Sequence, residues 1–213
     1  MLKNEANRNL EELEIGALNV SEVEETLGVV VRGMRDNPTH IAAFGENPEV
    51  RERRIRRLFS SAFVVLDLPR HMLAARSADG EIVGAMGIVP PGECRPSAAQ
   101  QLRLLPLLLA NGLRSAGRTA KWMGAWNKHD PTERHWHFGP LAVDAHLQGK
   151  GIGSKLMRVF CARMDAAGED AYLETDKLIN VRFYERFGFE VVGEEEVIGV
   201  TNWYMLRPAK RRY

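Results

Sequence analysis

Hydrophobic and polar positions follow two different periods along the chain, and these periods predict where helices and strands lie. The first third predicts a short strand within residues 10–18, a helix over 21–35 and a second helix over 47–63. Residues 71–89 form two alternating runs around Asp79-Gly80, a dipeptide typical of the turn in a β-hairpin. The first half of the chain therefore predicts a pair of helices followed by a small antiparallel unit.

The C-terminal half alternates between the two periods more regularly. A helical stretch over 96–129, which Pro106 is expected to kink or break, precedes a strand, a helix, a strand, a helix and two strands. Their ranges are 134–145, 151–167, 171–175, 178–189 and, for the last two strands together, 190–208. This order predicts one α/β domain of the α+β kind over residues 1–213, with a mixed sheet flanked by helices.

The helix predicted over 178–189 carries a hydrophobic stripe at Ile179, Phe183 and Phe187, and the following glycine is expected to end it. The stripe predicts which face of the helix is buried. Asn180 and Tyr184 lie off the stripe and one turn apart, which predicts that they share another face of the helix.

Composition narrows the class of protein without indicating a function. The 213 residues are 45% hydrophobic and 27% charged, with a formal net charge of +1. Such a balance gives no reason to expect nucleic acid or a membrane as a partner. The longest apolar run, 102–113, is too short to span a bilayer and is interrupted by Pro106. The first residues lack the apolar core of a signal peptide, so we expect a cytoplasmic protein.

The two cysteines carry little signal of their own. Cys94 and Cys161 are 67 positions apart, and neither has a cysteine or histidine at metal-ligand spacing. This predicts a reducing compartment, no disulfide framework and no metal site. The oligomeric state stays open, and a homodimer is compatible with the sequence.

A glycine-rich segment, HLQGKGIGSKLM at residues 146–157, stands directly before a predicted helix. Backbone N–H groups at a helix N-terminus attract anions, so the pattern indicates a phosphate site. Two well-known templates fail, because a dinucleotide fingerprint needs glycine where Ser154 stands and a P-loop does not allow the glycine that follows Lys150. Coenzyme A, another phosphate ligand and a plain tight turn all remain open from this loop alone.

A second signature lies further along the chain. In NVRFYERFGF, residues 180–189, an asparagine is followed four residues later by a tyrosine and then by Gly-Phe. Together with the pattern Q-x-x-G-x-G that starts at Gln148 after GPLAV, this resembles the GNAT superfamily of acyl-CoA-dependent N-acyltransferases. The resemblance covers residues 134–207 and extends to the hairpin predicted at residues 71–89. Residues 10–65 match only in holding two early helices, which vary in the family and shape the acceptor side.

The resemblance implies a single GNAT-like domain with a central, mostly antiparallel sheet, in which residues 134–207 bind coenzyme A and catalyse. It implies that acetyl-CoA is the co-substrate and that its acetyl group passes directly to a primary amine of a small molecule in a ternary complex. Two alternatives keep the fold: a non-catalytic acyl-CoA-binding sensor, and an acetyltransferase that acts on a protein amine. A third alternative, with a different fold, is another kind of nucleotide-binding α/β protein.

The resemblance also implies roles for individual residues. The glycine loop would hold the pyrophosphate with main-chain amides, Gln148 and Lys150 would add side-chain donors, and the strand before the loop would pair with the pantetheine arm. Tyr184 would donate a proton or hydrogen bond to the departing sulfur, and Asn180 would bond to the pantetheine or a bridging water. The full predicted cofactor set is Leu141, Ala142, Val143, Gln148, Gly149, Lys150, Gly151, Ile152, Gly153, Ser154, Asn180 and Tyr184.

Two histidines are the candidates for the base that takes the proton of the amine. His135 and His137 alternate on the strand before the loop, so they are expected on one face with Leu141 and Val143. Some arylalkylamine-acetylating members of the family carry two histidines on this strand, and matching their pattern places only His137 on one of them. Asp144, His146 and Glu174 are weaker candidates, and a water chain without a dedicated residue stays open.

Overall fold

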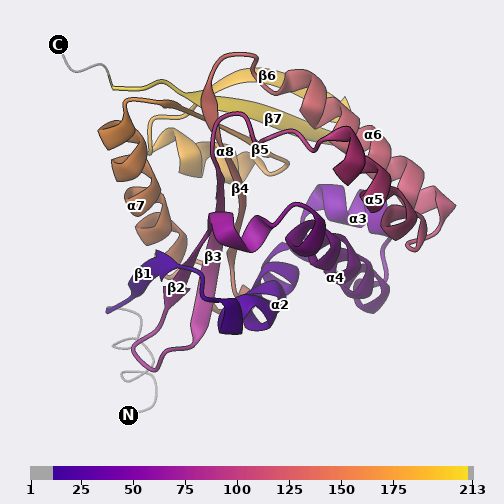
Figure 1. Ribbon diagram of the computed structural model, residues 1–213, viewed down its shortest axis with the longest axis horizontal. Coiled ribbons are helices and arrows are strands. Elements are labelled where there is room, and N and C mark those ends of the chain that lie inside the picture. The colour runs from indigo at the N-terminus through magenta and orange to yellow at the C-terminus, as the bar shows by residue number, and fades with distance from the viewer. Residues whose placement is uncertain (1–11, 211–213) are drawn as a thin grey trace.

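The computed structural model describes residues 12–210 and arranges them around one seven-stranded sheet (Figure 1). The strands are β1 Glu14–Ala17, β2 Met72–Arg76, β3 Ile82–Val89, β4 His135–Val143, β5 Asp170–Thr175, β6 Glu190–Val197 and β7 Val200–Arg207. Their order is β1-β2-β3-β4-β5-β7-β6, and all neighbours are antiparallel except β4 and β5. The predicted mixed, mostly antiparallel sheet is confirmed. The first eleven residues, where no signal peptide is expected, lie outside the described part.

Helices cover both faces of the sheet (Figure 1). One face packs against α7 and α8, and the other packs against α2, α3, α4 and α6. The helices are α2 Val23–Met34, α3 Pro38–Phe44, α4 Pro48–Val65, α5 Ala98–Leu109, α6 Leu113–His129, α7 Ile152–Ala167 and α8 Leu178–Glu185. Within residues 12–210, no helix is both long enough and apolar enough to cross a bilayer.

Two helices differ from what the sequence predicts. α3 is not expected from the pattern, because Asn37-Pro38 reads as the end of a helix; Pro38 instead occupies the first turn of a new one, where its missing N–H costs nothing. Pro106 neither breaks nor ends α5, which continues to Leu109. None of the residues of α5 is buried, so water can reach the carbonyl that Pro106 leaves without a partner.

The buried face of α8 also differs from the predicted one. Ile179 is 74% exposed, whereas Val181 and Tyr184 are 4% and 6% exposed. Phe183 and Phe187 are half-buried at the edge of the same core. The predicted stripe is therefore wrong at Ile179, and Tyr184 belongs to the core instead of lying apart from it.

An extra residue in β4 reverses the direction of the side chains that follow it. The register shifts between Met86 and Ile88 of β3, opposite Gly139-Pro140 of β4. Because side chains alternate along a strand, one inserted residue moves the following ones to the other face. Leu141 consequently packs on the core under α7, whereas His137 points to Asp130 at the end of α6. The expectation that His137 and Leu141 share one face is wrong for this reason.

A partly buried ion pair ties the turn before α2 to the end of β2. The guanidinium of Arg76 donates to both carboxylate oxygens of Glu22, at 2.6 and 2.7 Å. Hydrogen bonding to Arg76 lowers the pKa of Glu22 from 4.5 to about 2. The pair therefore stabilises the fold above the ordinary pKa of glutamate, and this contribution is lost as the pH falls toward the lowered value.

Glu22→Gln is accordingly expected to lower the free energy of unfolding at neutral pH by roughly 1–3 kcal/mol, and to flatten its fall below about pH 5. Urea unfolding over a series of pH values measures both effects. Glu24→Gln is the matched control, because the ion pair of Glu24 with Arg56 lies on the surface and should contribute little. Equal acid dependence in Glu22→Gln and the unaltered protein would contradict the assignment.

Candidate functional site

β4 and β5 are joined over only part of their length. His135, Trp136 and His137 pair with residues 170–172 of β5, and no later residue of β4 pairs with that strand. The edge of β4 that faces β5 is therefore unpaired from Phe138 to Val143 within the described chain. An unpaired strand edge offers backbone donors and acceptors to an extended, peptide-like ligand. This edge includes the predicted pantetheine contacts.

The glycine loop leads from the end of β4 into α7, and two of its glycines are required by their backbone conformation. Gly149 and Gly151 have φ angles of +78° and +86°, which residues with a Cβ rarely adopt. A Cβ at either position would meet no atom within 4 Å, so packing does not exclude one. Gly153 differs, because its Cβ would make ordinary contacts with Phe183. The free N–H groups of the first turn of α7 follow directly, which suits an anion.

The polar side chains of the loop are not all turned outward. The side-chain amide of Gln148 donates to the backbone carbonyl oxygens of Gly33 and Val143, both at 3.2 Å. Gln148 therefore anchors the loop to α2 and β4, where the sequence predicts a donor to phosphate. Lys150 is exposed, and Ile152 is buried beneath the first turn of α7.

Tyr184 and Asn180 of α8 have different surroundings. The ring of Tyr184 packs against Phe138 and Phe183, with centroids 5.7 and 5.2 Å apart. Burial raises the pKa of Tyr184 above its ordinary value, so its hydroxyl stays protonated at neutral pH. The side-chain amide of Asn180 donates to the hydroxyl of Thr175 at 3.1 Å and thereby joins the start of α8 to β5.

The two histidines of β4 meet carboxylates. Nε2 of His135 lies 3.2 Å from Asp130, and His137 lies between Asp130 at 3.4 Å and Glu174 at 3.1 Å. Burial opposes charge on the imidazole of His135, but the hydrogen bonds to Asp130, Cys94 and the backbone of Glu133 together outweigh it and raise the pKa to about 10. For His137 burial is likewise outweighed, chiefly by Glu174, and the pKa again rises to about 10. The neighbouring carboxylates therefore favour the protonated form of both imidazoles, which weighs against His137 as a base.

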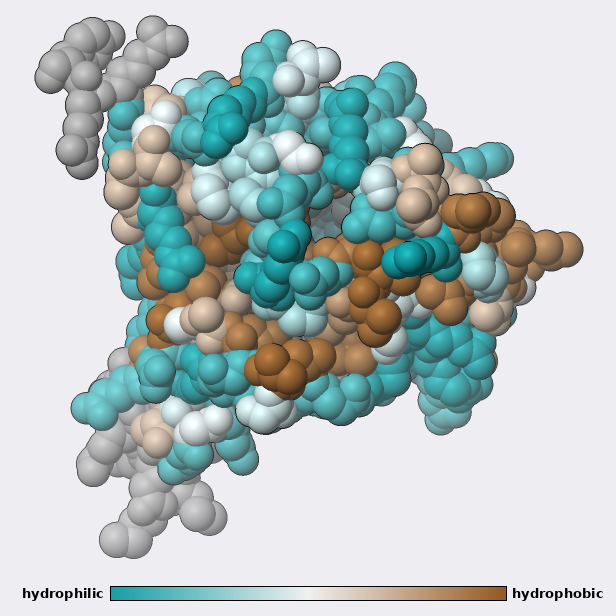
Figure 2. Space-filling view, in the orientation of Figure 1, coloured by the Kyte–Doolittle hydropathy of each residue, from teal (hydrophilic) through white to brown (hydrophobic). Residues whose placement is uncertain are grey.

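Three buried polar atoms on the face of the sheet that carries these histidines have no hydrogen-bond partner among the described residues. They are the hydroxyls of Tyr172 and Tyr204 and one carboxylate oxygen of Glu174. Glu174 and Tyr204 are direct partners across β5 and β7. Figure 2 shows the molecule hollowed near the middle of this view, beside β4 and β5. Sequence reasoning missed the tyrosines and Asp130, because nothing near them in the chain marks them.

The chain matches known acetyltransferases in sequence profile and in fold. The profile described as acetyltransferase (GNAT) family matches residues 39–189. A Corynebacterium glutamicum structure described as histone acetyltransferase HPA2 and related acetyltransferase is 20% identical, with TM-score 0.70 over 94% of this chain and 98% of that one. Arylalkylamine N-acetyltransferase 2 from Aedes aegypti is 14% identical, with TM-score 0.64 over 93% and 100%.

A third structure is a GNAT family acetyltransferase from Brucella melitensis in complex with acetyl-CoA. It is 16% identical, with TM-score 0.53 over 95% of this chain and 91% of that one. At such identities the structures establish the fold alone. The family profile spans well over half of the sequence and includes both the glycine loop and α8. This chain belongs to the GNAT family of acetyltransferases.

Proposed function

We propose that the protein transfers the acetyl group of acetyl-CoA to the primary amine of a small molecule, directly and within a ternary complex. The observation that carries the proposal is the unpaired edge of β4 next to the left-handed glycine loop and the start of α7. An extended arm that ends in a pyrophosphate matches both features at once. A nucleotide without such an arm would leave the strand edge unused.

In this proposal the main chain of the loop holds the pyrophosphate, and the backbone of Leu141 to Val143 pairs with the pantetheine arm. Gln148 acts indirectly, because its amide fixes the loop to α2 and β4. Tyr184 donates a hydrogen bond to the sulfur as the carbon–sulfur bond breaks. Burial suits this role, since it keeps the phenol protonated until the thiolate develops.

The acceptor amine approaches from the face of the sheet that carries His137, opposite the face that packs against α7 and α8. Glu174, Tyr172 and Tyr204 supply a carboxylate oxygen and two hydroxyls that no described residue occupies, and an ammonium group offers three donors to such a set. Both nitrogens of His137 are engaged by carboxylates, so we assign the removal of the amine's proton to water. The similarity to an arylalkylamine acetyltransferase agrees with an acceptor of small size.

An acetyl-CoA thiol-release screen tests this function. The panel contains diamines, arylalkylamines, amino acids and N-terminal peptides, and each primary amine is matched by its N,N-dimethyl form, which cannot be acetylated stably. We expect release above background with at least one small primary amine and none with its dimethyl control. Background release throughout, together with tight binding of coenzyme A, would support a sensor instead. Release with peptides alone would support a protein amine as the acceptor.

A further inference from the structure

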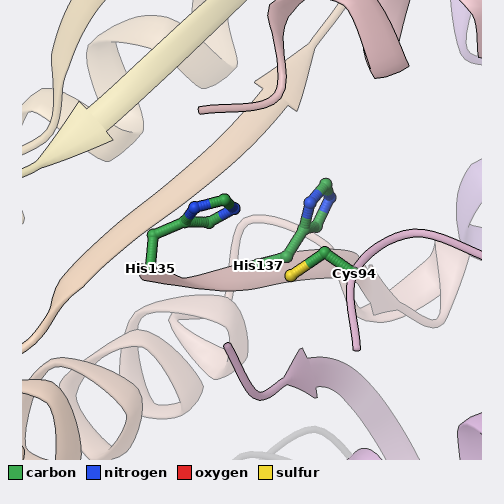
Figure 3. A group of neighbouring side chains, drawn as sticks. All are labelled: Cys94, His135 and His137. Atoms are coloured by element: carbon green, nitrogen blue, oxygen red, sulfur yellow. The ribbon is translucent and has the colours of Figure 1, made fainter. Parts of the chain in front are cut away.

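Cys94 and the two histidines of β4 meet in space outside the glycine loop (Figure 3). Their sulfur and ring nitrogen atoms all lie within 4.8 Å of one another. Cys94 comes from the loop after β3, whereas His135 and His137 alternate on one face of β4. Asp130, which follows α6, brings one carboxylate oxygen to both histidines. A thiolate, two imidazoles and a carboxylate are ligands that zinc takes in proteins.

Each histidine is oriented so that one ring nitrogen faces the cluster. In His135, Nδ1 lies 2.8 Å from the carbonyl oxygen of Glu133, which leaves Nε2 facing Asp130. In His137, Nε2 lies 3.1 Å from Glu174, which leaves Nδ1 facing the same oxygen of Asp130. Metal-bound histidines almost always use their second nitrogen in this way, as a donor to a carboxylate or a backbone carbonyl.

The distances within the cluster match those between ligands of one metal ion. Zinc bonds to nitrogen and oxygen are about 2.0–2.1 Å long, so neighbouring ligand atoms in a tetrahedral site lie about 3.3 Å apart. The nitrogens of His135 and His137 lie 3.2 and 3.4 Å from Oδ1 of Asp130. Both distances agree with that spacing, and the ligand atoms of Cys94, His135 and His137 all lie within 4.8 Å of one another.

We propose that Cys94, His135 and His137 bind one zinc ion, with the carboxylate of Asp130 beside both imidazoles. The protein supplies three ligands, and both His135 and the neighbouring Asp130 are buried. The thiolate and the carboxylate balance the two charges of the ion. Outside this shell, Arg95 donates to the other oxygen of Asp130 at 2.8 Å, and Glu174 faces His137. The ion would join the loop after β3 and the end of α6 to β4.

No proposed ligand of the ion belongs to the glycine loop or to α8, whereas Glu174, which faces His137, is shared with the proposed acceptor site. Among the described residues, this is the one group of three or more histidine, cysteine or acidic side chains close enough together to hold a metal ion. The spacing of the cysteines along the chain predicts no such site, because Cys94 is brought to the histidines only by the pairing of β3 with β4.

Metal binding by the full-length protein is the direct test. Protein stripped with EDTA is titrated with zinc chloride against a chromogenic chelator, and with cobalt chloride while absorbance is recorded. We expect about one zinc ion per chain, a higher Tm with zinc, and a cobalt spectrum with tetrahedral d–d bands and a thiolate charge-transfer band. No stoichiometric zinc binding, or cobalt binding without the thiolate band, would overturn the proposal.

Cys94→Ser separates this site from adventitious metal binding. It should lower zinc affinity by roughly 100-fold or more and abolish the thiolate band. The other cysteine gives the matched control, and Cys161→Ser should leave the zinc affinity and the cobalt spectrum unchanged. Circular dichroism without metal reports whether each variant folds. An equal loss of zinc affinity in both cysteine variants, or no loss in Cys94→Ser, would count against the assigned ligands. If a variant misfolds, the cobalt spectrum of the unaltered protein still tests the proposal.

Discussion

Gly151→Asp is expected to lower the affinity for coenzyme A by roughly 100-fold or more while the protein stays folded. Gly151 precedes the first turn of α7, where free backbone N–H groups face the site proposed for the pyrophosphate. A carboxylate a few ångströms from that anion costs about 3–4 kcal/mol at an effective dielectric constant near 20. Isothermal titration calorimetry with coenzyme A measures the loss.

Gly151→Asn separates the effect of charge from the effect of backbone strain. Asparagine and aspartate have nearly the same shape, and both tolerate the left-handed conformation that Gly151 adopts at φ +86°. A Cβ at this position meets no neighbour within 4 Å, so neither variant should disturb packing. We therefore expect Gly151→Asn to keep most of the affinity. Equal losses in the two variants would mean that the loop binds through its conformation alone, and no loss in either would remove the site.

Elements with strong local signals are the part of the fold that the sequence predicts well. Asp79-Gly80 lies in the turn of the hairpin, as predicted, with β2 before it and β3 after it. α7 begins directly after Gly151 and ends at Gly168, both in the left-handed conformation that punctuates helices. In each case a glycine or a turn dipeptide marks the boundary, and the hydrophobic period between boundaries identifies the element.

The face of a side chain is harder to predict than the element that carries it. Alternation along β4 places His137 with Leu141, but one inserted residue at Gly139-Pro140 puts them on opposite sides of the sheet. The period of α8 suggests Ile179 as a core residue, yet the short helix buries Val181 and Tyr184 instead. Each error displaces the predicted face by a small number of residues. The local pattern does not resolve such a displacement, because the buried face depends on the neighbouring strands.

The surroundings of the candidate site could not be predicted for a different reason. Asp130 and Glu174 flank His137 from the end of α6 and from β5, and these segments meet only through the order of strands in the sheet. Their carboxylates raise the pKa of the imidazole, so the contacts disfavour the role of base that the sequence suggests for this histidine. Residue type suggests the chemistry of a group, but contacts between distant segments determine its charge state.

Tyr184→Phe is expected to lower kcat by roughly 100-fold or more and to change the KM for acetyl-CoA little, because the hydroxyl acts on the departing sulfur rather than on binding. The ring contacts with Phe138 and Phe183 do not involve the hydroxyl and survive the change. Steady-state kinetics on the amine found in the thiol-release screen measures both constants, and thermal unfolding should give nearly the same Tm.

Tyr204→Phe provides the comparison that distinguishes catalysis from a general effect of losing a buried hydroxyl. Tyr204 is as deeply buried as Tyr184, but it lies on the acceptor face and its hydroxyl has no partner among the described residues. If that hydroxyl receives the amine, its removal should raise the KM for the amine more than it lowers kcat. Tyr184→Phe must show the opposite result, a large fall in kcat with little change in KM. An unchanged kcat in Tyr184→Phe would make this residue a packing residue, and the thiolate would then have to leave without an acid from α8.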